Sequence, residues 1–204
     1  MITADKFLIP ARELGFNFFT GTPCSYLKPF INYVIDADGF DFYDSVNEGE
    51  AVAIAAGATV AGKRAVVMFQ NSGLGNAVNP LTSLTYTFNL PVMVITTLRG
   101  EPGGAADEPQ HELMGQITTQ MLETMKLKWA YFPQTEEEVL PALKAADEYM
   151  KKTSQPFVFV MRKDDIAEYK LQKKAAPSQK SFKITHEDHF EFDYANRVMR
   201  TPVL

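Results

Sequence analysis

The long polar segment at residues 98–112 contains side chains that could bind or protonate a substrate. Its sequence, LRGEPGGAADEPQHE, includes Arg99, Gln110 and His111. An imidazole suits proton transfer near neutral pH, and a guanidinium can hold a carboxylate or another planar or tetrahedral oxyanion through two hydrogen bonds. Gln110 could hydrogen-bond a substrate or an intermediate. The alternatives, a solvated loop histidine and an ordinary surface arginine, stay open on the residues alone.

A carboxylate at the start of a predicted helix, Glu48, is the second candidate for chemistry. Asn47 suits the N-cap position, and Glu50, three residues further on, suits the carboxylate of a capping box. Glu48 itself could be a catalytic carboxyl or a first-turn carboxylate stabilised by the helix dipole, and its spacing leaves both interpretations open. Glu50 is interpreted as a capping residue.

Two further motifs resemble ligand sites only superficially. The turn Ser72-Gly73-Leu74-Gly75-Asn76 lacks the third glycine of a dinucleotide fingerprint and the Lys-Ser/Thr of a phosphate-binding loop. On its residues alone it is a plain tight turn. The group His186-Glu187-Asp188-His189 lies in an irregular tail and is interpreted as a solvated charge run, so no metal ligand is assigned.

Short apolar, β-rich runs alternate with longer helical patterns along the chain. This alternation predicts an α/β fold with a parallel sheet of about six strands and helices on both faces. The expected strands are residues 16–20, 40–44, 64–69, 91–97, 129–132 and 156–161. The expected helices are residues 3–14, a helix capped by Ser25, one starting at Asn47, then 76–88, 114–125 and 135–153. The candidate residues follow strands, at the carboxyl edge where open α/β sheets bind ligands.

The composition narrows the class of partner. The chain has 204 residues, of which 46% are hydrophobic and 22% charged, as in a soluble globular protein. Its formal net charge of −5 argues against nucleic acid and anionic membranes as partners, so an anionic substrate would need a local cationic pocket. A lone cysteine, Cys24, a polar N-terminus and the lack of an apolar run that could span a bilayer predict a cytoplasmic protein.

The stretch VNEGEAVAIAAGATVAGKRAVVMFQNSGLGN resembles the pyrimidine-binding domain of thiamine-diphosphate enzymes, such as pyruvate decarboxylase and acetolactate synthase. Those domains carry a glutamate that opens an alanine-rich helix and a glycine nine residues later, and Glu48 and Gly57 match this spacing. The resemblance implies that Glu48 hydrogen-bonds N1′ of the cofactor's aminopyrimidine, stabilising the imino tautomer that removes the proton from thiazolium C2. Gly73, Gly75 and Asn76 would shape the cofactor pocket.

Two other segments resemble a narrower group, the phosphonopyruvate and sulfopyruvate decarboxylases. They are GTPCSYLKPFINYV at residues 21–34 and EPGGAADEPQHELMGQIT at residues 101–118. The resemblance implies decarboxylation of a 2-oxo acid with an anionic 3-substituent, with phosphonopyruvate as the first choice and sulfopyruvate as the alternative. Pyruvate decarboxylases carry an acidic residue where this chain has Ser25, and losing that charge would suit a dianionic substrate. Ser25, Gln110 and His111 would face the substrate or an intermediate, with His111 as proton donor.

The sequence lacks the diphosphate-binding motif that enzymes of the resembled family need. In this family a second domain, marked by Gly-Asp-Gly, holds the cofactor's diphosphate through Mg²⁺, and no Gly-Asp-Gly occurs here. Residues 1–162 are therefore expected to be a pyrimidine-binding domain, and 163–204 a linker or extended tail towards a diphosphate-binding domain or subunit. The chain would supply half a site within a homo- or hetero-oligomer, as a natural subunit or as part of a longer enzyme. An alternative of another class is a non-catalytic assembly or regulatory domain.

Overall fold

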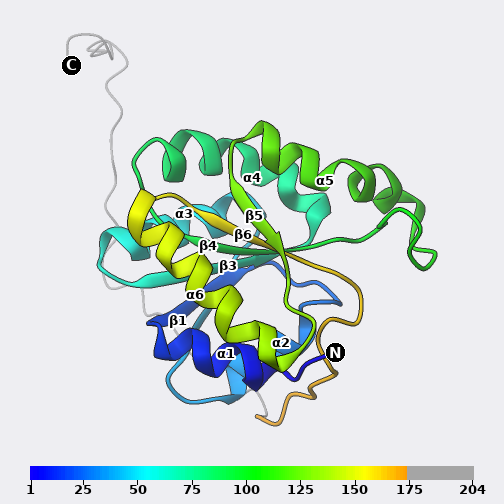
Figure 1. The fold of residues 1–204 in the computed structure, drawn as a ribbon, viewed down its shortest axis with the longest axis horizontal. Coiled ribbons are helices and arrows are strands. Elements are labelled where there is room, and N and C mark those ends of the chain that lie inside the picture. Colours follow the sequence, from blue (N-terminus) through cyan, green and yellow to red (C-terminus); the bar gives the residue numbers. More distant parts are fainter. Residues whose placement is uncertain (174–204) are drawn as a thin grey trace, which may run out of the picture. The chain divides into compact units, whose positions relative to one another are not determined.

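A parallel β-sheet forms the centre of the computed structural model, which describes residues 1–173 (Figure 1). Six strands lie in the order β2-β1-β3-β4-β6-β5, and every neighbouring pair is parallel. The strands are β1 (Phe16–Gly21), β2 (Asp41–Asp44), β3 (Arg64–Phe69), β4 (Met93–Thr97), β5 (Lys128–Tyr131) and β6 (Phe157–Met161). The central strands are buried almost throughout, whereas β2 at one edge is mainly exposed. The predicted fold class is confirmed.

Helices cover both faces of the sheet (Figure 1). One face packs against α1 (Ala4–Glu13), α2 (Lys28–Asp36) and α6 (Glu136–Thr153), and the other against α3 (Glu48–Val60), α4 (Leu74–Pro80) and α5 (Glu112–Thr124). Because successive strand residues point to opposite faces, Val66 and Met68 join the first core, whereas Val67 and Phe69 join the second. No helix within residues 1–173 is long and apolar enough to cross a membrane.

Several helices differ from their predicted bounds by one or two residues, and for two of them the structure shows the reason. The helix expected to be capped by Ser25 begins at Lys28 instead, with Leu27 in the cap position and Pro29 in the first turn. Proline suits that turn because its missing N–H would be unpaired there anyway. The helix expected at 76–88 begins earlier, since the 3-10 turn η1 (Asn71–Gly73) leads directly into α4. It ends as a π-helix, η2 (Leu81–Tyr86), after Pro80, whose ring and missing N–H interrupt regular α-helical bonding.

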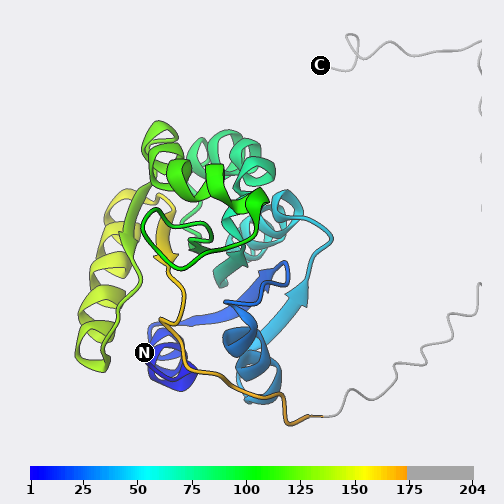
Figure 2. The ribbon, with the colours of Figure 1, turned by 90° about the vertical axis from the view of Figure 1, so that its right-hand side faces the viewer.

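The segment that follows β6 packs against the domain for longer than predicted. Ile166 is buried and pairs with Ile2 in an isolated parallel bridge, and the Asn32 side chain donates a 2.8 Å hydrogen bond to the carbonyl of Tyr169. Figure 2 shows this segment, in orange, running along α2. The compact unit therefore extends to Lys173, beyond the boundary expected at residue 162. The rest of the predicted tail, including the group from His186 to His189, lies outside the described residues.

Candidate active site

The first residue of α3, Glu48, lies where the loops after β1 and β3 meet. Its half-buried carboxylate accepts a 3.1 Å hydrogen bond at Oε1 from the Thr22 hydroxyl and a 2.9 Å bond at Oε2 from the Asn76 side-chain amide. Thr22 follows β1 and Asn76 follows β3, so three separate segments fix one carboxyl group. Glu48 and Asn76 were both predicted site residues, whereas Thr22 was not, although it lies in the segment 21–34 that carries the resemblance.

The capping of α3 is carried out by other residues, as the sequence predicts. Asn47 accepts a 3.0 Å hydrogen bond from the backbone N–H of Glu50. The Glu50 carboxylate in turn accepts a 2.7 Å bond from the N–H of Val46, one residue before the N-cap. Because Asn47 and Glu50 satisfy the helix start, Glu48 is left to bind Thr22 and Asn76.

The backbone at Gly73 lies directly against the Glu48 carboxyl group. A Cβ atom added at Gly73 would come within 2.1 Å of Glu48 Cδ, so no other residue fits here without moving Glu48. At Gly75, by contrast, an added Cβ would meet no atom within 4 Å, and the residue is exposed. The two glycines of the turn therefore have different surroundings, one packed on the carboxyl and the other bordering open space.

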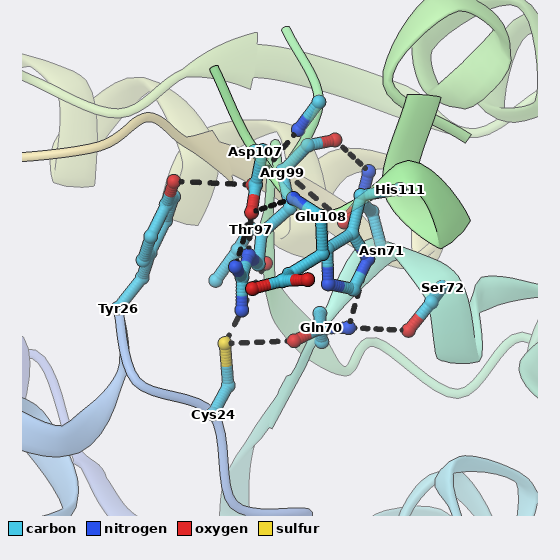
Figure 3. A network of polar contacts seen from close by, with 11 residues as sticks. Cys24, Tyr26, Gln70, Asn71, Ser72, Thr97, Arg99, Asp107, Glu108 and His111 are labelled. Carbon is cyan, nitrogen blue, oxygen red and sulfur yellow. Dashed lines mark hydrogen bonds and ion pairs between the residues drawn. The ribbon is translucent and has the colours of Figure 1, made fainter. Parts of the chain in front are cut away.

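His111 belongs to a second polar cluster at the same edge, drawn in Figure 3. It lies in the 3-10 turn η3 (Pro109–His111) and is only 5% exposed, so the alternative of a solvated loop histidine is wrong. Its Nδ1 atom is 3.4 Å from Nε2 of Gln70, which follows β3. Gln70 Nε2 also donates a 2.6 Å hydrogen bond to the Ser72 hydroxyl, and Gln70 Oε1 accepts one of 3.5 Å from the Cys24 thiol.

Arg99, proposed from the sequence as an anion-binding residue, forms an internal ion pair with Asp107. Its Nε donates a 2.9 Å hydrogen bond to Asp107 Oδ2, and its Nη2 pairs with Oδ1. Asp107 also accepts hydrogen bonds from the backbone N–H groups of Gly100 and Glu108, at 3.2 and 2.8 Å. The hydrogen bonds from Arg99 hold the pKa of Asp107 well below its usual range. Binding of a substrate anion by Arg99 stays a prediction, and that anion would compete with Asp107.

The buried side chain of Asn71 joins the segments that carry these groups. Its Nδ2 donates 3.0 Å hydrogen bonds to the Arg99 carbonyl and the Thr118 hydroxyl, and its Oδ1 accepts a 3.2 Å bond from the Arg99 N–H. Asn71 thus ties the turn after β3 to the loop after β4 and to α5. The sequence did not single out this residue, because its role depends on partners that are distant along the chain.

Comparison with known proteins shows the family to which the chain belongs. Residues 4–122 match the family described as "Thiamine pyrophosphate enzyme, N-terminal TPP binding domain". The chain belongs to this family. It is 40% identical over 178 residues to a phosphonopyruvate decarboxylase of Streptomyces viridochromogenes, covering 87% of this chain and 45% of that protein. It is 32% identical over 145 residues to a sulfopyruvate decarboxylase subunit alpha of Methanocaldococcus jannaschii, covering 71% of this chain and 84% of that subunit.

Solved structures of thiamine pyrophosphate enzymes share the fold. The benzoylformate decarboxylase of Polynucleobacter necessarius superposes with a TM-score of 0.64 at 23% identity, covering 86% of this chain and 33% of that one. The chain spans less than half the length of the phosphonopyruvate decarboxylases it matches. It therefore corresponds to one part of those proteins.

The remaining predicted contacts of this thiamine pyrophosphate enzyme domain, Ser25 and Gln110, are both exposed. Ser25 lines a pocket of about 420 Å³ together with Lys28, Arg162 and Lys163, and acidic side chains also border it. Among the described residues, no hydrogen bond joins Ser25 or Gln110 to Glu48 or His111. Within residues 1–173, no group of three His, Cys, Asp or Glu side chains is arranged to hold a metal ion.

Replacing Asp107 by asparagine in this thiamine pyrophosphate enzyme domain should lower the free energy of unfolding by about 2 kcal/mol at neutral pH. The reason is that the shielded Arg99 guanidinium would lose its charged partner. Since the folded-state pKa of Asp107 is lowered, its carboxylate stabilises the fold fully above the unfolded-state value of about 4, and the contribution is lost as the pH falls through the folded-state pKa. Denaturant unfolding of both proteins at neutral and acid pH measures the difference.

A matched control for Asp107 is the exposed Asp38, which is paired with Lys173 at 3.7 Å. Asp38→Asn should change the free energy of unfolding little at any pH, because exposed ion pairs contribute little. The destabilisation by Asp107→Asn should shrink below about pH 4. A difference from wild type that stays constant from neutral to acid pH would contradict the role given to the Arg99 pair.

Proposed function

We propose that this chain supplies the aminopyrimidine half of the active site of a thiamine-diphosphate-dependent 2-oxo-acid decarboxylase. The observation that carries the proposal is the Glu48 carboxylate, held by Thr22 and Asn76 and packed on Gly73. A carboxyl group positioned by three segments and kept at a sheet edge suits proton transfer to a bound ring better than it suits a structural role. The 40% identity to a phosphonopyruvate decarboxylase supports phosphonopyruvate as the preferred candidate substrate, which would yield phosphonoacetaldehyde and CO₂.

The residues around Glu48 fit the aminopyrimidine ring. Each carboxylate oxygen accepts one hydrogen bond from the protein, which leaves further acceptor capacity for N1′ of the ring. Asn76 and Thr22 would orient the carboxyl so that it holds a proton between its oxygen and N1′. The bare backbone at Gly73 leaves room for the Glu48 carboxyl, and the bare backbone at Gly75, which borders open space, would let a flat ring approach closely. When bound, thiamine diphosphate supplies the electron sink for decarboxylation.

The other groups at this edge would act on the substrate. His111 would deliver a proton after CO₂ leaves, and its burial would shield that proton from bulk water. Gln110 would hydrogen-bond the substrate or an intermediate. Ser25 would border the anionic group without adding charge, and the cationic side chains of its pocket, Lys28 and Lys163, would offset the protein's net charge of −5.

Assembly and location follow from the same proposal. A separate diphosphate-binding domain or subunit would hold the diphosphate through Mg²⁺, so the active form would be an oligomer or a longer chain. We also propose a cytoplasmic location, since Cys24 is a free, buried thiol.

A second candidate function is that of a sulfopyruvate decarboxylase subunit alpha. The match to the Methanocaldococcus jannaschii subunit, which covers 84% of that protein at 32% identity, supports this alternative. A non-catalytic assembly domain is less consistent with Glu48. Such a domain has no need for a carboxyl group held by a hydroxyl, an amide and a bare glycine.

The test is a decarboxylation assay with thiamine diphosphate and Mg²⁺, on the chain alone and mixed with the diphosphate-binding portion encoded beside or after it. We expect turnover only in the mixture, and faster turnover of phosphonopyruvate than of sulfopyruvate. If the mixture decarboxylated sulfopyruvate but not phosphonopyruvate, the second candidate function would be established. Activity of the chain by itself would contradict the half-site, and a well-formed but inactive complex would favour an assembly domain.

A further inference from the structure

The contacts of Gln70 define the hydrogen-bonding state of the buried His111 ring (Figure 3). His111 Nδ1 faces Nε2 of Gln70 at 3.4 Å, a long but direct contact. An amide nitrogen can only donate hydrogen bonds, so Nδ1 must accept and therefore carries no proton in this arrangement. In a neutral imidazole the proton then resides on Nε2.

The orientation of the Gln70 amide is set by its other two partners. Nε2 donates to the Ser72 hydroxyl at 2.6 Å, and Oε1 faces the Cys24 thiol at 3.5 Å. A thiol is a weak donor and a weak acceptor. If the amide were reversed, its nitrogen would face the thiol, which is a poor acceptor, while the carbonyl oxygen would accept from Ser72 and from a protonated Nδ1. The observed orientation gives both amide protons better acceptors, Ser72 Oγ and His111 Nδ1.

We propose that Gln70 is a positioning residue that holds His111 as its Nε2–H tautomer. Within residues 1–173, Nε2 of His111 makes no hydrogen bond to the protein, so this nitrogen remains for a bound molecule. On the proposed function, on which this part of the inference rests, the Nε2–H group of His111 donates a hydrogen bond to the substrate-derived intermediate. Gln70 thereby determines which ring nitrogen carries the proton, without touching the substrate itself.

The tautomer can be measured without any catalysis. We would label histidine with ¹⁵N in the 204-residue chain and record which ring nitrogen of His111 has the chemical shift and couplings of a protonated nitrogen. The chain has three histidines, and a His111→Gln variant assigns the signals of His111. The test variant is Gln70→Met, which keeps the length of the side chain and removes the amide. The matched control is Gln120→Met at an exposed position of α5.

We expect the Nε2–H tautomer to dominate in the wild type and in Gln120→Met. In Gln70→Met the ratio of Nε2–H to Nδ1–H should fall by roughly two- to tenfold, the range that a single net hydrogen bond supplies. Gln70→Glu should favour a protonated Nδ1 instead, because a carboxylate accepts where the amide donates. A wild-type Nδ1–H tautomer, or an unchanged ratio in Gln70→Met, would overturn the proposal.

The outcomes for this inference and for the proposed function are separable. A wild-type Nε2–H tautomer that is lost in Gln70→Met would establish the positioning role even if no 2-oxo acid were decarboxylated. If decarboxylation is observed, Gln70→Met should lower kcat more than it raises KM, since it weakens the hydrogen bond that His111 offers to the intermediate and leaves the binding groups in place. Should Gln70→Met fail to fold, the wild-type and Gln70→Glu spectra still decide the question.

Discussion

Decarboxylation by the reconstituted enzyme should fall by about 10²- to 10⁴-fold in kcat when Glu48 is replaced by glutamine, the range that a positioned acid–base group contributes. Glutamine has nearly the same shape as glutamate, but its amide cannot hold a proton between itself and the cofactor's N1′. The protein contacts should survive, because Asn76 can still donate to the amide oxygen, and the Thr22 hydroxyl can rotate to accept from the new N–H. Timed assays of CO₂ release measure the change in kcat, and circular dichroism of the variant shows whether its secondary structure is intact.

A matched control for Glu48 exists two residues away in the same helical turn. Glu50 is exposed and caps the Val46 N–H, a role that glutamine also fills in capping boxes. Glu50→Gln should therefore keep kcat within a few-fold of wild type. If Glu48→Gln and Glu50→Gln reduced kcat equally, the loss would reflect altered charge at the start of α3, and Glu48 would not be the catalytic carboxyl.

The strand pattern could be predicted from the sequence because each central strand is apolar on both sides. The run Arg64–Phe69 was predicted with the bounds that the structure gives it, since its residues fill two cores that lie on opposite faces of the sheet. Helix starts were harder to predict. Ser25 has the right side chain for a cap, yet Leu27 takes that position, because local propensity is weaker than the packing of Phe30 and Val34 on the sheet.

The candidate site could be predicted only in part, for a physical reason. Glu48 and Gly73 lie in a motif that can be recognised along the chain, and the structure brings them into contact. Thr22, by contrast, bonds a carboxylate 26 residues away, and Gln70 meets His111 across 41 residues. Such pairs exist only because parallel strands align their carboxyl ends, and a single sequence does not say which of several polar loop residues will meet.

The loop after β4 shows how a polar segment becomes ordered. Its composition is that of a solvated loop, yet Asp107 binds the Arg99 guanidinium, and His111 is buried. Close contacts between backbone atoms also order this loop. A Cβ at Gly100, whose φ is +71°, would come within 2.2 Å of the His111 carbonyl oxygen, so the two ends of the loop touch through bare backbone.

Replacing Gly115 by alanine should lower the free energy of unfolding by about 3 kcal/mol, the upper range for overpacking a buried position. Gly115 is buried in α5, and an added Cβ would lie 1.7 Å from the Gly100 carbonyl oxygen and 2.8 Å from that of Arg99. Both neighbours are backbone atoms, so no rotamer change relieves the clash, and α5 must move away from the loop. Urea unfolding of the 204-residue chain measures the effect.

The control for Gly115 is another helical glycine, Gly57 in α3, where an added Cβ meets no atom within 4 Å. Gly57→Ala should raise the free energy of unfolding by up to about 1 kcal/mol, because alanine is the better helix former and nothing obstructs it. Opposite signs for the same chemical change would locate the effect of Gly115→Ala in its contact with the loop. If both alanines stabilised the chain equally, the close approach of α5 to Gly100 would be wrong, and with it the reason why His111 is held in a buried turn beside Gln70.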